Sequence, residues 1–381
     1  MRVAVLGGGP AGAFAATRLA QAGMSAVLID EKLAWEKPCG GGLTYKAYTR
    51  YPFLVQNDTP KRFVTETSLA APGGGETKLT LDQPLVIYSR KQLNGLLLKR
   101  AEQAGVQIEK ARVTAAERIG AGWRIRTGTG TIDADYCLLA MGARNPLRQY
   151  GTQLGTADTM SALGYYVPGE QAGIDIQFLP NLAGYIWVFP RCGHMSVGIC
   201  GKGEAASSLR KRLETYMEQR GLQFAGAQFY SHVLPCLDTP SWSTNRVAGD
   251  GWMAVGDAAG LVDPITGEGL YYALRSAELA ADCLLQRTGP ANPQTYAHQL
   301  RDDFTHDLEY GSQLAERIFH GSFLFGRIPA RMVQWTRRSP LFKAAIQDLF
   351  AGTQSYVGLK RRLLRNLSGS LWEVALSGWK K

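Results

Sequence analysis

The chain opens with two short apolar runs, VAVL and AVLID, on either side of a stretch with helical spacing. In that stretch Ala16, Leu19 and Ala20 share one face of a helix, and Gly23 follows as a stop signal. The pattern therefore predicts a strand, a helix and a second strand that closes at Asp30.

A later run, AGYIWVFP, alternates with a period of two. On an extended strand its aromatic residues Tyr185, Trp187 and Phe189 lie on one face, and the two aliphatic residues between them point to the other. Pro190 ends the pairing because it has no N–H to donate. The aromatic row is either ordinary sheet core or the wall of a pocket, and the pattern by itself leaves both open.

Composition and charge narrow the class of protein. With 381 residues the chain is longer than one small core needs, so we expect more than one domain. The net charge is +10, but residues 315–381 hold 12 Lys and Arg against 3 Asp and Glu, so the rest of the chain is nearly neutral. This distribution argues against a nucleic-acid partner and indicates an anionic membrane surface or an anionic ligand.

Cysteine, histidine and apolar patterns exclude several alternatives. The six cysteines form no C-x-x-C pair and the five histidines lack metal-ligand spacing, so we predict neither a disulfide framework nor a metal site. The sequence contains no run of about 18 apolar residues, so we predict no membrane-spanning helix. The first residues do not have the pattern of a signal peptide. We expect a reducing, cytoplasmic setting.

The first predicted turn carries G-x-G-x-x-G, formed by Gly7, Gly9 and Gly12. These glycines allow, in that order, a tight turn, close approach of a pyrophosphate and close packing of helix on strand. The pyrophosphate then meets a helix N-terminus, where free N–H groups and the helix dipole favour an anion. Asp30 is expected to accept hydrogen bonds from the adenosine ribose, and Glu31 is the competing acid. The sequence predicts a dinucleotide site.

A second glycine-rich segment, GWMAVGDAAGLVDPITGEGL, lies far along the chain. A predicted strand at 252–255 runs into Gly256 and Asp257, and a helix is expected from about Glu268. The loop between them brings backbone amides to a helix N-terminus that can face a polar or anionic group. Asp257 can accept a hydrogen bond from a ribityl hydroxyl.

Together the two segments resemble the FAD-dependent enzymes of the aromatic-hydroxylase type. The segment YSRKQLNGLLLKRAEQAG is also similar, with Arg90 at the position of that family's FAD-contacting arginine. The resemblance implies that Asp257 binds the ribityl chain and that residues 264–270 lie beside the isoalloxazine ring. The complete set of expected FAD-binding residues is Gly7, Gly9, Gly12, Asp30, Glu31, Cys39, Gly40, Gly41, Arg90, Gly142, Gly256, Asp257, Pro264, Gly267, Gly269 and Leu270.

One segment departs from the NADPH-dependent hydroxylases, which carry Asp-Gly where this chain has Met141 and Gly142. Two others, EKPCGGGL and PNLAGYIWVFP, resemble the geranylgeranyl reductase family, whose members show segments of the K-P-C-G-G and P-x-x-Y-x-W-x-F-P types. Here the gap between Pro180 and Tyr185 is longer than the family's usual one. This resemblance covers roughly residues 1–290.

The second resemblance implies roles for the aromatic strand and for one cysteine. Tyr185, Trp187 and Phe189 would line a hydrophobic cavity for an isoprenoid chain, and Cys39 would lie near the flavin as a proton donor or a substrate-positioning group. By residue type alone, a free cysteine is also a small buried hydrophobe. Reduced FAD would deliver a hydride to one alkene carbon, and Cys39 or water a proton to the other. The electron donor is either NADPH or a reduced protein carrier.

The predicted fold is α/β plus an antiparallel sheet: a Rossmann-like FAD-binding domain, an interleaved substrate domain and a helical C-terminal segment. The predicted boundaries are 1–60, 88–150 and 246–290 for the FAD-binding domain, 61–87 and 151–245 for the substrate-binding sheet, and 291–381 for the basic helical segment. The predicted function is reduction of C=C bonds in an isoprenoid chain. The alternatives are a flavin-dependent monooxygenase or halogenase, a cyclase without net redox change, and a non-catalytic lipid-binding protein.

The C-terminal segment repeats apolar residues at helical spacing beside clustered cations. In GLKRRLLRNLSGSLWEVAL, leucines 359, 363, 367 and 371 form a stripe next to four Lys and Arg residues. Such a helix either binds a membrane interface reversibly or packs on the protein with a solvated basic face. With an isoprenoid lipid as substrate, the first interpretation predicts peripheral membrane contact.

Overall fold

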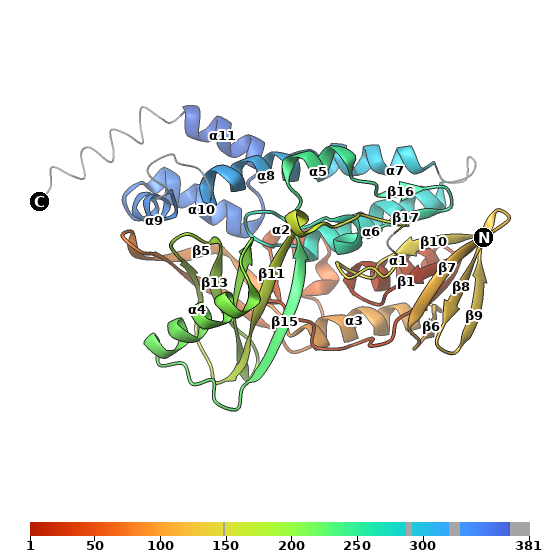
Figure 1. The fold of residues 1–381 in the computed structure, drawn as a ribbon, viewed down its shortest axis with the longest axis horizontal. Helices are drawn as coiled ribbons and strands as arrows, with labels where there is room; N and C mark the ends of the chain where they lie inside the picture. The colour runs from red at the N-terminus through yellow and green to blue at the C-terminus, as the bar shows by residue number, and fades with distance from the viewer. Residues whose placement is uncertain (148, 287–291, 320–327, 366–381) are drawn as a thin grey trace, which may run out of the picture. The chain divides into compact units, whose positions relative to one another are not determined.

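The structure is a computed structural model that describes the whole chain except residues 148, 287–291, 320–327 and 366–381 (Figure 1). The chain forms two compact units, each assembled from three separate segments. The first unit comprises Met1–Lys37, Arg90–Thr159 and Val233–Glu309, and the second comprises Pro38–Ser89, Met160–His232 and the described residues of 310–381. Each unit is built around its own large sheet.

The first unit contains a six-stranded sheet in the order β16-β17-β10-β1-β2-β6. Neighbouring strands are parallel except for the β16–β17 pair at one edge. The strands are β1 (Arg2–Leu6), β2 (Ser25–Ile29), β6 (Gln107–Glu109), β10 (Tyr136–Leu139), β16 (Ala248–Gly249) and β17 (Trp252–Ala254). Parallel strands covered on both faces are apolar along their length, and residues 3–6 of β1 are completely buried.

Helix α1 (Pro10–Gln21) connects β1 to β2 and contacts α3 (Arg90–Gln103) and α6 (Leu270–Leu285). The predicted strand, helix and strand at the start of the chain are therefore confirmed. The unit also holds an antiparallel sheet of β7 (Val113–Ile119), β8 (Gly122–Thr127) and β9 (Gly130–Ala134). Its other helices are η2 (Thr156–Asp158), α5 (Thr239–Thr244), η3 (Gly256–Ala259), α7 (Pro293–Leu300) and η4 (Arg301–Thr305). Helix α8 (His306–Phe319) begins in this unit and continues into the second.

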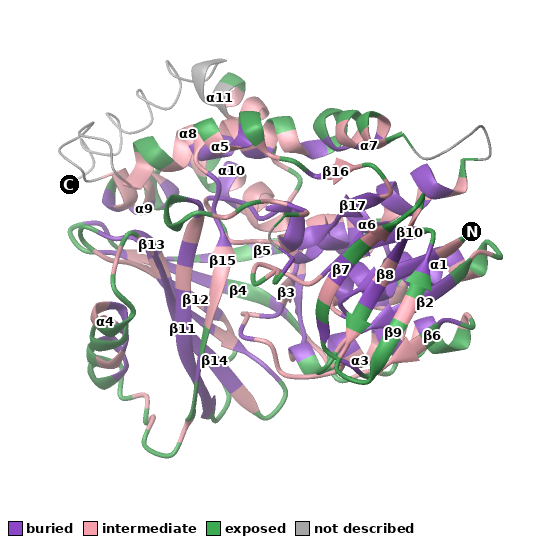
Figure 2. Ribbon diagram, turned by 45° about the vertical axis from the view of Figure 1, so that its right-hand side comes forward, coloured by how far each residue is buried: buried purple, intermediate pink, exposed green. Residues whose placement is uncertain are grey.

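The second unit contains an eight-stranded sheet in the order β15-β11-β14-β13-β12-β4-β5-β3, largely antiparallel. Its strands are β3 (Gly42–Leu43), β4 (Arg62–Ala71), β5 (Gly75–Ile87), β11 (Thr159–Pro168), β12 (Ile174–Phe178), β13 (Ala183–Pro190), β14 (His194–Lys202) and β15 (Gln228–Pro235). Residues 61–87, which were predicted to belong to the substrate-binding sheet, form the β4–β5 hairpin. Figure 2 shows β11 buried over most of its length.

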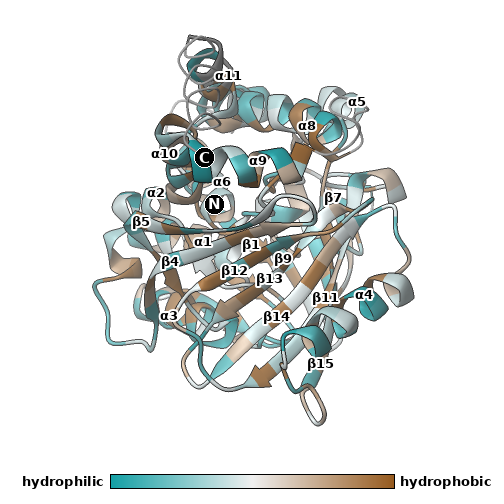
Figure 3. Ribbon diagram, turned by 90° about the vertical axis from the view of Figure 1, so that its left-hand side faces the viewer, coloured by the Kyte–Doolittle hydropathy of each residue, from teal (hydrophilic) through white to brown (hydrophobic). Residues whose placement is uncertain are grey.

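Alternation along β13 follows the sequence pattern. Ile186 and Val188 are completely buried and share a core cluster with Leu209, Leu213 and Met217 of α4 (Ala206–Gln219). Much of α4 is coloured hydrophilic in Figure 3, and its buried residues are those that belong to this cluster. The aromatic residues of β13 therefore occupy the opposite face of the sheet.

The remaining helices of the second unit are α2 (Tyr45–Arg50), η1 (Pro52–Leu54), α9 (Ile328–Arg338), α10 (Pro340–Ala351) and α11 (Tyr356–Arg365). Helices α9 and α10 contact the β4–β5 hairpin, and the Gln334 and Gln347 side chains donate to the carbonyls of Gly73 and Thr80. Of the predicted leucine stripe, Leu367 and Leu371 lie outside the described residues. None of the described helices is long and apolar enough to span a bilayer.

The compact units divide the chain differently from the predicted boundaries. Residues 38–60 group with the second unit, because β3 pairs with β5 of the large antiparallel sheet. Residues 233–245 group with the first unit, and so do residues 292–309. The helix expected from Glu268 begins at Leu270, because the Glu268 carboxylate accepts a hydrogen bond from the Tyr271 N–H and so lies just before the first turn.

Candidate functional site

The glycine turn between β1 and α1 has the geometry that a pyrophosphate site requires. Gly7 has φ +112°, and a Cβ there would lie 2.3 Å from the Ala140 carbonyl oxygen. A Cβ at Gly12 would lie 1.9 Å from the Gly7 carbonyl oxygen. Gly9 precedes the first residue of α1 and has no neighbouring atom within 4 Å of a Cβ position. The N-terminus of α1 is therefore open to an anion at Gly9, while Gly7 and Gly12 make the close approach possible.

Asp30 follows β2 and faces this turn. Its carboxylate accepts hydrogen bonds from the backbone N–H groups of Gly8 (2.7 Å), Lys32 (2.7 Å) and Leu33 (2.6 Å). Asp30, which was predicted to bind the adenosine ribose, therefore also orders the backbone around it. Glu31, the competing acid, is exposed, and its Oε2 lies 3.9 Å from Arg112 Nε. Of the two acids, Asp30 is the one held at the glycine turn.

Arg90, the first residue of α3, is held by a glutamate that the sequence analysis did not single out. Glu36 accepts from the backbone N–H groups of Arg90 (2.8 Å) and Lys91 (3.1 Å), so it caps the helix. The Arg90 side chain is 4% exposed, and its nearest hydrogen bond is a long one to Asn94 Oδ1 (3.4 Å). Its Nε is buried and has no hydrogen-bond partner in the structure. A buried unsatisfied donor is costly unless a ligand accepts from it.

Asp257 lies in η3, immediately after β17, and pairs with Lys37. Lys37 Nζ lies 2.8 Å from Asp257 Oδ2, with side chains 18% and 14% exposed. Gly142, which follows β10, has φ +76°, and a Cβ there would lie 3.9 Å from the same Lys37 Nζ. The Lys37 ammonium thus lies near the ends of two adjacent parallel strands. The sequence motifs predict roles for Asp257 and Gly142 but none for Lys37.

The loop before α6 is ordered by an Asx turn. Asp263 Oδ1 accepts from the N–H groups of Ile265 (2.9 Å) and Thr266 (2.8 Å), and its backbone N–H donates to the Glu268 carbonyl (2.8 Å). Gly267 has φ +70°, and Gly269 precedes the first residue of α6. The residues predicted to lie beside the flavin ring, Pro264, Gly267, Gly269 and Leu270, therefore lie in one hydrogen-bonded loop that leads into the N-terminus of α6.

The three segments of the first unit thus carry the predicted FAD-binding residues except Cys39, Gly40 and Gly41, which belong to the second unit. The open N-terminus of α1, the unsatisfied Arg90 Nε and the η3 carboxylate suit the pyrophosphate and hydroxyl groups of FAD. These residues fit the cofactor. Their individual contacts with it remain predictions.

In the second unit, the Cys39 loop packs against the aromatic face of β13. A Cβ at Gly40 would lie 3.3 Å from the Phe189 ring, and one at Gly42 would lie 3.0 Å from it. Gly41 has φ +85°, and a Cβ there would lie 2.0 Å from the Tyr88 carbonyl oxygen. The half-buried Cys39 Sγ accepts from the Gly41 N–H at 3.3 Å. Glycines at these positions let the loop lie directly on the ring.

The three aromatic residues of β13 differ in exposure. Trp187 is 6% exposed, and its indole occupies the space above Gly198, where a Cβ would lie 2.2 Å from the ring. Tyr185 and Phe189 are half-buried, with the Tyr185 ring 6.3 Å from that of Trp187. Trp187 is therefore part of the sheet core. Tyr185 and Phe189 retain surface that can meet a ligand.

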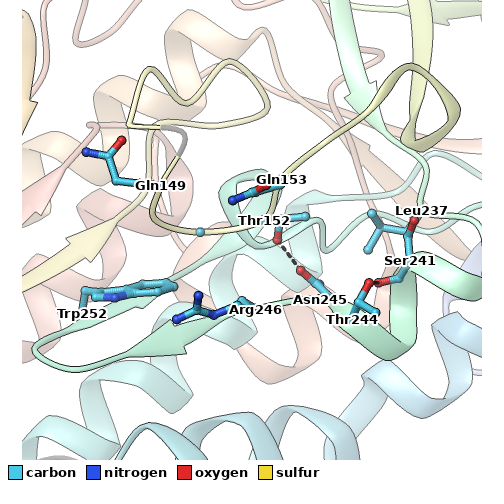
Figure 4. A pocket seen from close by; sticks show the side chains of 10 residues that line it. Gln149, Thr152, Gln153, Leu237, Ser241, Thr244, Asn245, Arg246 and Trp252 are labelled. Atoms are coloured by element: carbon cyan, nitrogen blue, oxygen red, sulfur yellow. Dashed lines mark hydrogen bonds between the residues drawn. The ribbon is translucent and has the colours of Figure 1, made fainter.

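A separate polar cavity of about 360 Å³ lies in the first unit (Figure 4). Its walls come from residues 149–153, from α5 and from the segment that leads into β17, and Thr152 donates to Asn245 Oδ1 across it at 2.7 Å. None of its ten lining residues is among the predicted site residues. It is not the cofactor site that the motifs define.

Comparisons with known proteins agree with the fold. The family described as pyridine nucleotide-disulphide oxidoreductase matches residues 1–159. A geranylgeranyl bacteriochlorophyll reductase-like protein of Thermoplasma acidophilum shares the fold, with a TM-score of 0.79, 22% identity and coverage of 96% of this chain and 98% of that one. The flavin-dependent brominase Bmp2 shares it less closely, with a TM-score of 0.70 and 16% identity over 92% and 94% of the two chains. The fold and the family match are those of an FAD-dependent oxidoreductase.

Its curated relatives point to a branch of that class. The chain is 27% identical to the chloroplastic geranylgeranyl diphosphate reductase of Arabidopsis thaliana, over 75% of this chain and 66% of that protein. It is 28% identical to the menaquinone reductase of Mycobacterium tuberculosis, over 75% and 76%. It is also 28% identical to digeranylgeranylglycerophospholipid reductase 2 of Methanothermobacter thermautotrophicus, over 74% and 76%. These similarities confirm the resemblance to geranylgeranyl reductases.

Proposed function

We propose that the protein uses reduced FAD to saturate C=C bonds in the chain of an isoprenoid lipid. The relatives named above differ in head group, whereas a diphosphate, a quinone and a glycerophospholipid can all carry an isoprenoid chain. The observation that carries the proposal is the packing of the loop that follows the half-buried Cys39 on Phe189, a ring of the aromatic sheet face. Because the lipids in these names can share an isoprenoid chain but differ in head group, we expect the chain, and not the head group, to be reduced.

Saturating an alkene requires a hydride and a proton. When bound and reduced, FAD supplies the hydride. The protein supplies the proton from the Cys39 thiol, whose S–H bond breaks as the new C–H bond forms at the second alkene carbon. The Gly41 N–H, which donates to Sγ, stabilises the thiolate left behind until solvent reprotonates it.

The half-buried rings of Tyr185 and Phe189 supply the binding surface for the chain in this proposal. Each CH₂ group that leaves water contributes roughly 0.8 kcal/mol, so contact with a few isoprene units supplies several kcal/mol without any polar contact. Trp187 supports this surface from within the sheet. Recognition by apolar contact tolerates different head groups.

An anaerobic half-reaction tests the proposal. Purified protein is reduced with dithionite, mixed with geranylgeranyl diphosphate, and followed by its flavin absorbance and by mass spectrometry of the lipid. Return of the oxidised flavin bands with a product heavier by multiples of two hydrogens supports the proposal. If the flavin stays reduced until air enters, the oxygen chemistry of a monooxygenase or halogenase replaces it. A lipid product of unchanged mass indicates a cyclase.

We also propose that the basic C-terminal segment contacts an anionic membrane surface. In its described part Arg337 and Arg338 are exposed at the end of α9, and Arg361 is exposed on α11. Sedimentation with phosphatidylglycerol vesicles, but not with phosphatidylcholine vesicles, is expected at low salt, with loss of binding as salt screens the charges. Equal sedimentation with both would contradict an electrostatic contact.

A further inference from the structure

A buried arginine lies beneath the Cys39 loop. Arg191 follows β13 and is completely buried, and its backbone N–H donates to the His194 carbonyl at 2.8 Å. Its guanidinium donates to the Cys39 carbonyl through one terminal nitrogen and to the Gly40 carbonyl through Nε at 3.4 Å. Its guanidinium also lies over the ring of Tyr166, whose centroid is 5.2 Å from Arg191 Cζ. One cation thus binds two successive carbonyls of the loop.

The Cys39 carbonyl also accepts from a second buried side chain. Ser196 Oγ, on β14, donates to it at 3.1 Å. The same hydroxyl lies 2.9 Å from the Tyr230 hydroxyl and 3.4 Å from Trp187 Nε1. Burial raises the pKa of Tyr230, so its hydroxyl stays protonated and can donate to Ser196. Ser196 then has its own proton available for the Cys39 carbonyl.

These contacts define the conformation of Cys39 on both sides of its Cα atom. The carbonyl is held by Arg191 and Ser196, and Sγ is held by the Gly41 N–H. Three glycines follow the cysteine, and glycine loses more conformational entropy on ordering than any other residue. A loop of this composition needs external donors to adopt one conformation. Hydrogen bonds from a charged group in a dry environment are the strongest available.

We propose that Arg191 and Ser196 are positioning residues that fix the Cys39 carbonyl and thereby hold the Cys39 thiol in one orientation on the aromatic face of β13. Its consequence for catalysis rests on the proposed function, because Cys39 is the proton donor there. The claim that Arg191 and Ser196 fix the Cys39 loop does not depend on the proposed function. Arg191 and Ser196 act through Cys39 and need no contact with substrate.

Thiol reactivity tests the structural claim without any turnover. In a Cys192→Ser background, Cys39 is the one cysteine that is not buried, so its rate with Ellman's reagent can be read directly. If the loop must open for reaction, the rate follows the open population. Arg191→Met should raise the rate about tenfold, Ser196→Ala about threefold, and Arg191→Lys by less than Arg191→Met. Lysine keeps the charge but lacks the planar fork.

Arg210→Met is the matched control. Arg210 lies in the same unit and also stacks on an aromatic ring, with its Cζ 4.7 Å from the Phe229 centroid. It pairs with Glu214 at 2.8 Å. Its loss should leave the Cys39 rate within about twofold of the parent. Equal rates for the parent, Ser196→Ala and a folded Arg191→Met would overturn the proposal. If Arg191→Met does not fold, Ser196→Ala and Arg191→Lys decide it.

A double-mutant cycle on lipid reduction then tests the catalytic consequence. Arg191→Lys should lower kcat more than it raises KM, and this loss should disappear in a Cys39→Ala background. An equal loss in both backgrounds would mean that Arg191 does not act through Cys39. Absence of lipid reduction by the unaltered protein would refute the proposed function instead. The thiol rates would still decide whether Arg191 and Ser196 hold the loop.

Discussion

Removing the Lys37 ammonium from its pair with Asp257 should destabilise the first unit. Pairs of exposed charges contribute about 0–1 kcal/mol, whereas removing one partner of a fully buried pair costs about 3–5 kcal/mol. The Lys37 and Asp257 side chains are 18% and 14% exposed, between these limits but closer to burial. We therefore expect Lys37→Met to cost about 2 kcal/mol, which lowers the unfolding temperature of a unit of this size by about 6 °C.

A double-mutant cycle separates the pair from other effects of the substitution. Asp257→Asn should cost a similar amount, and Lys37→Met combined with Asp257→Asn should cost at least about 1 kcal/mol less than the sum of the two. The unfolding temperature is measured by circular dichroism on FAD-free protein at constant ionic strength. Lys110→Met, which removes an exposed lysine of the same unit, serves as the control and should change it little. Strict additivity of the two single changes would refute the reasoning.

Three further predictions concern the cofactor, the thiol and pH. Gly12→Ala places a Cβ where the Gly7 carbonyl lies and should abolish FAD retention on purification, whereas Gly128→Ala, with nothing within 4 Å, should retain FAD at wild-type stoichiometry. Cys39→Ala should lower lipid reduction by about 10²-fold or more while FAD stays bound, and unchanged turnover would remove the thiol from the mechanism. Burial raises the pKa of the Cys283 thiol to about 11, so it stays neutral at pH 8. Mass-spectrometric mapping should find Cys283 unalkylated there and labelled increasingly as the pH approaches 11; rapid labelling at pH 8 would contradict its burial.

Patterns that repeat over a few residues predicted most of the fold. The β1–α1–β2 unit and the alternation of β13 each follow from a short-range periodicity. The prediction that residues 38–60 belong with the cofactor domain differs from the structure, because the pairing of β3 with β5 depends on a contact that no local pattern encodes.

The candidate site shows the same difference between short local motifs and contacts between residues far apart in the sequence. The glycine turn, Asp257 and Cys39 lie in recognisable motifs, and the structure places each motif at a strand end, a helix start or a tight loop. Lys37, Glu36 and Arg191 act on partners 220, 54 and 152 residues away, and no spacing in the sequence connects them. A buried arginine is also the side chain that composition least predicts, because charged residues are almost never fully buried unless paired.

The aromatic row of β13 is explained by the strand beside it. In the β13–β14 register, Tyr185, Trp187 and Phe189 lie opposite Cys200, Gly198 and Ser196, which are all small. A ring can therefore lie across its partner, as Trp187 does over Gly198, because a larger side chain there would displace it. At the end of the row the small partner is a serine, whose hydroxyl reaches the Cys39 carbonyl while the adjacent Phe189 ring covers Gly40 and Gly42. The row is thus sheet core at Trp187 and support for the Cys39 loop at Phe189, and its role as a pocket wall stays a prediction.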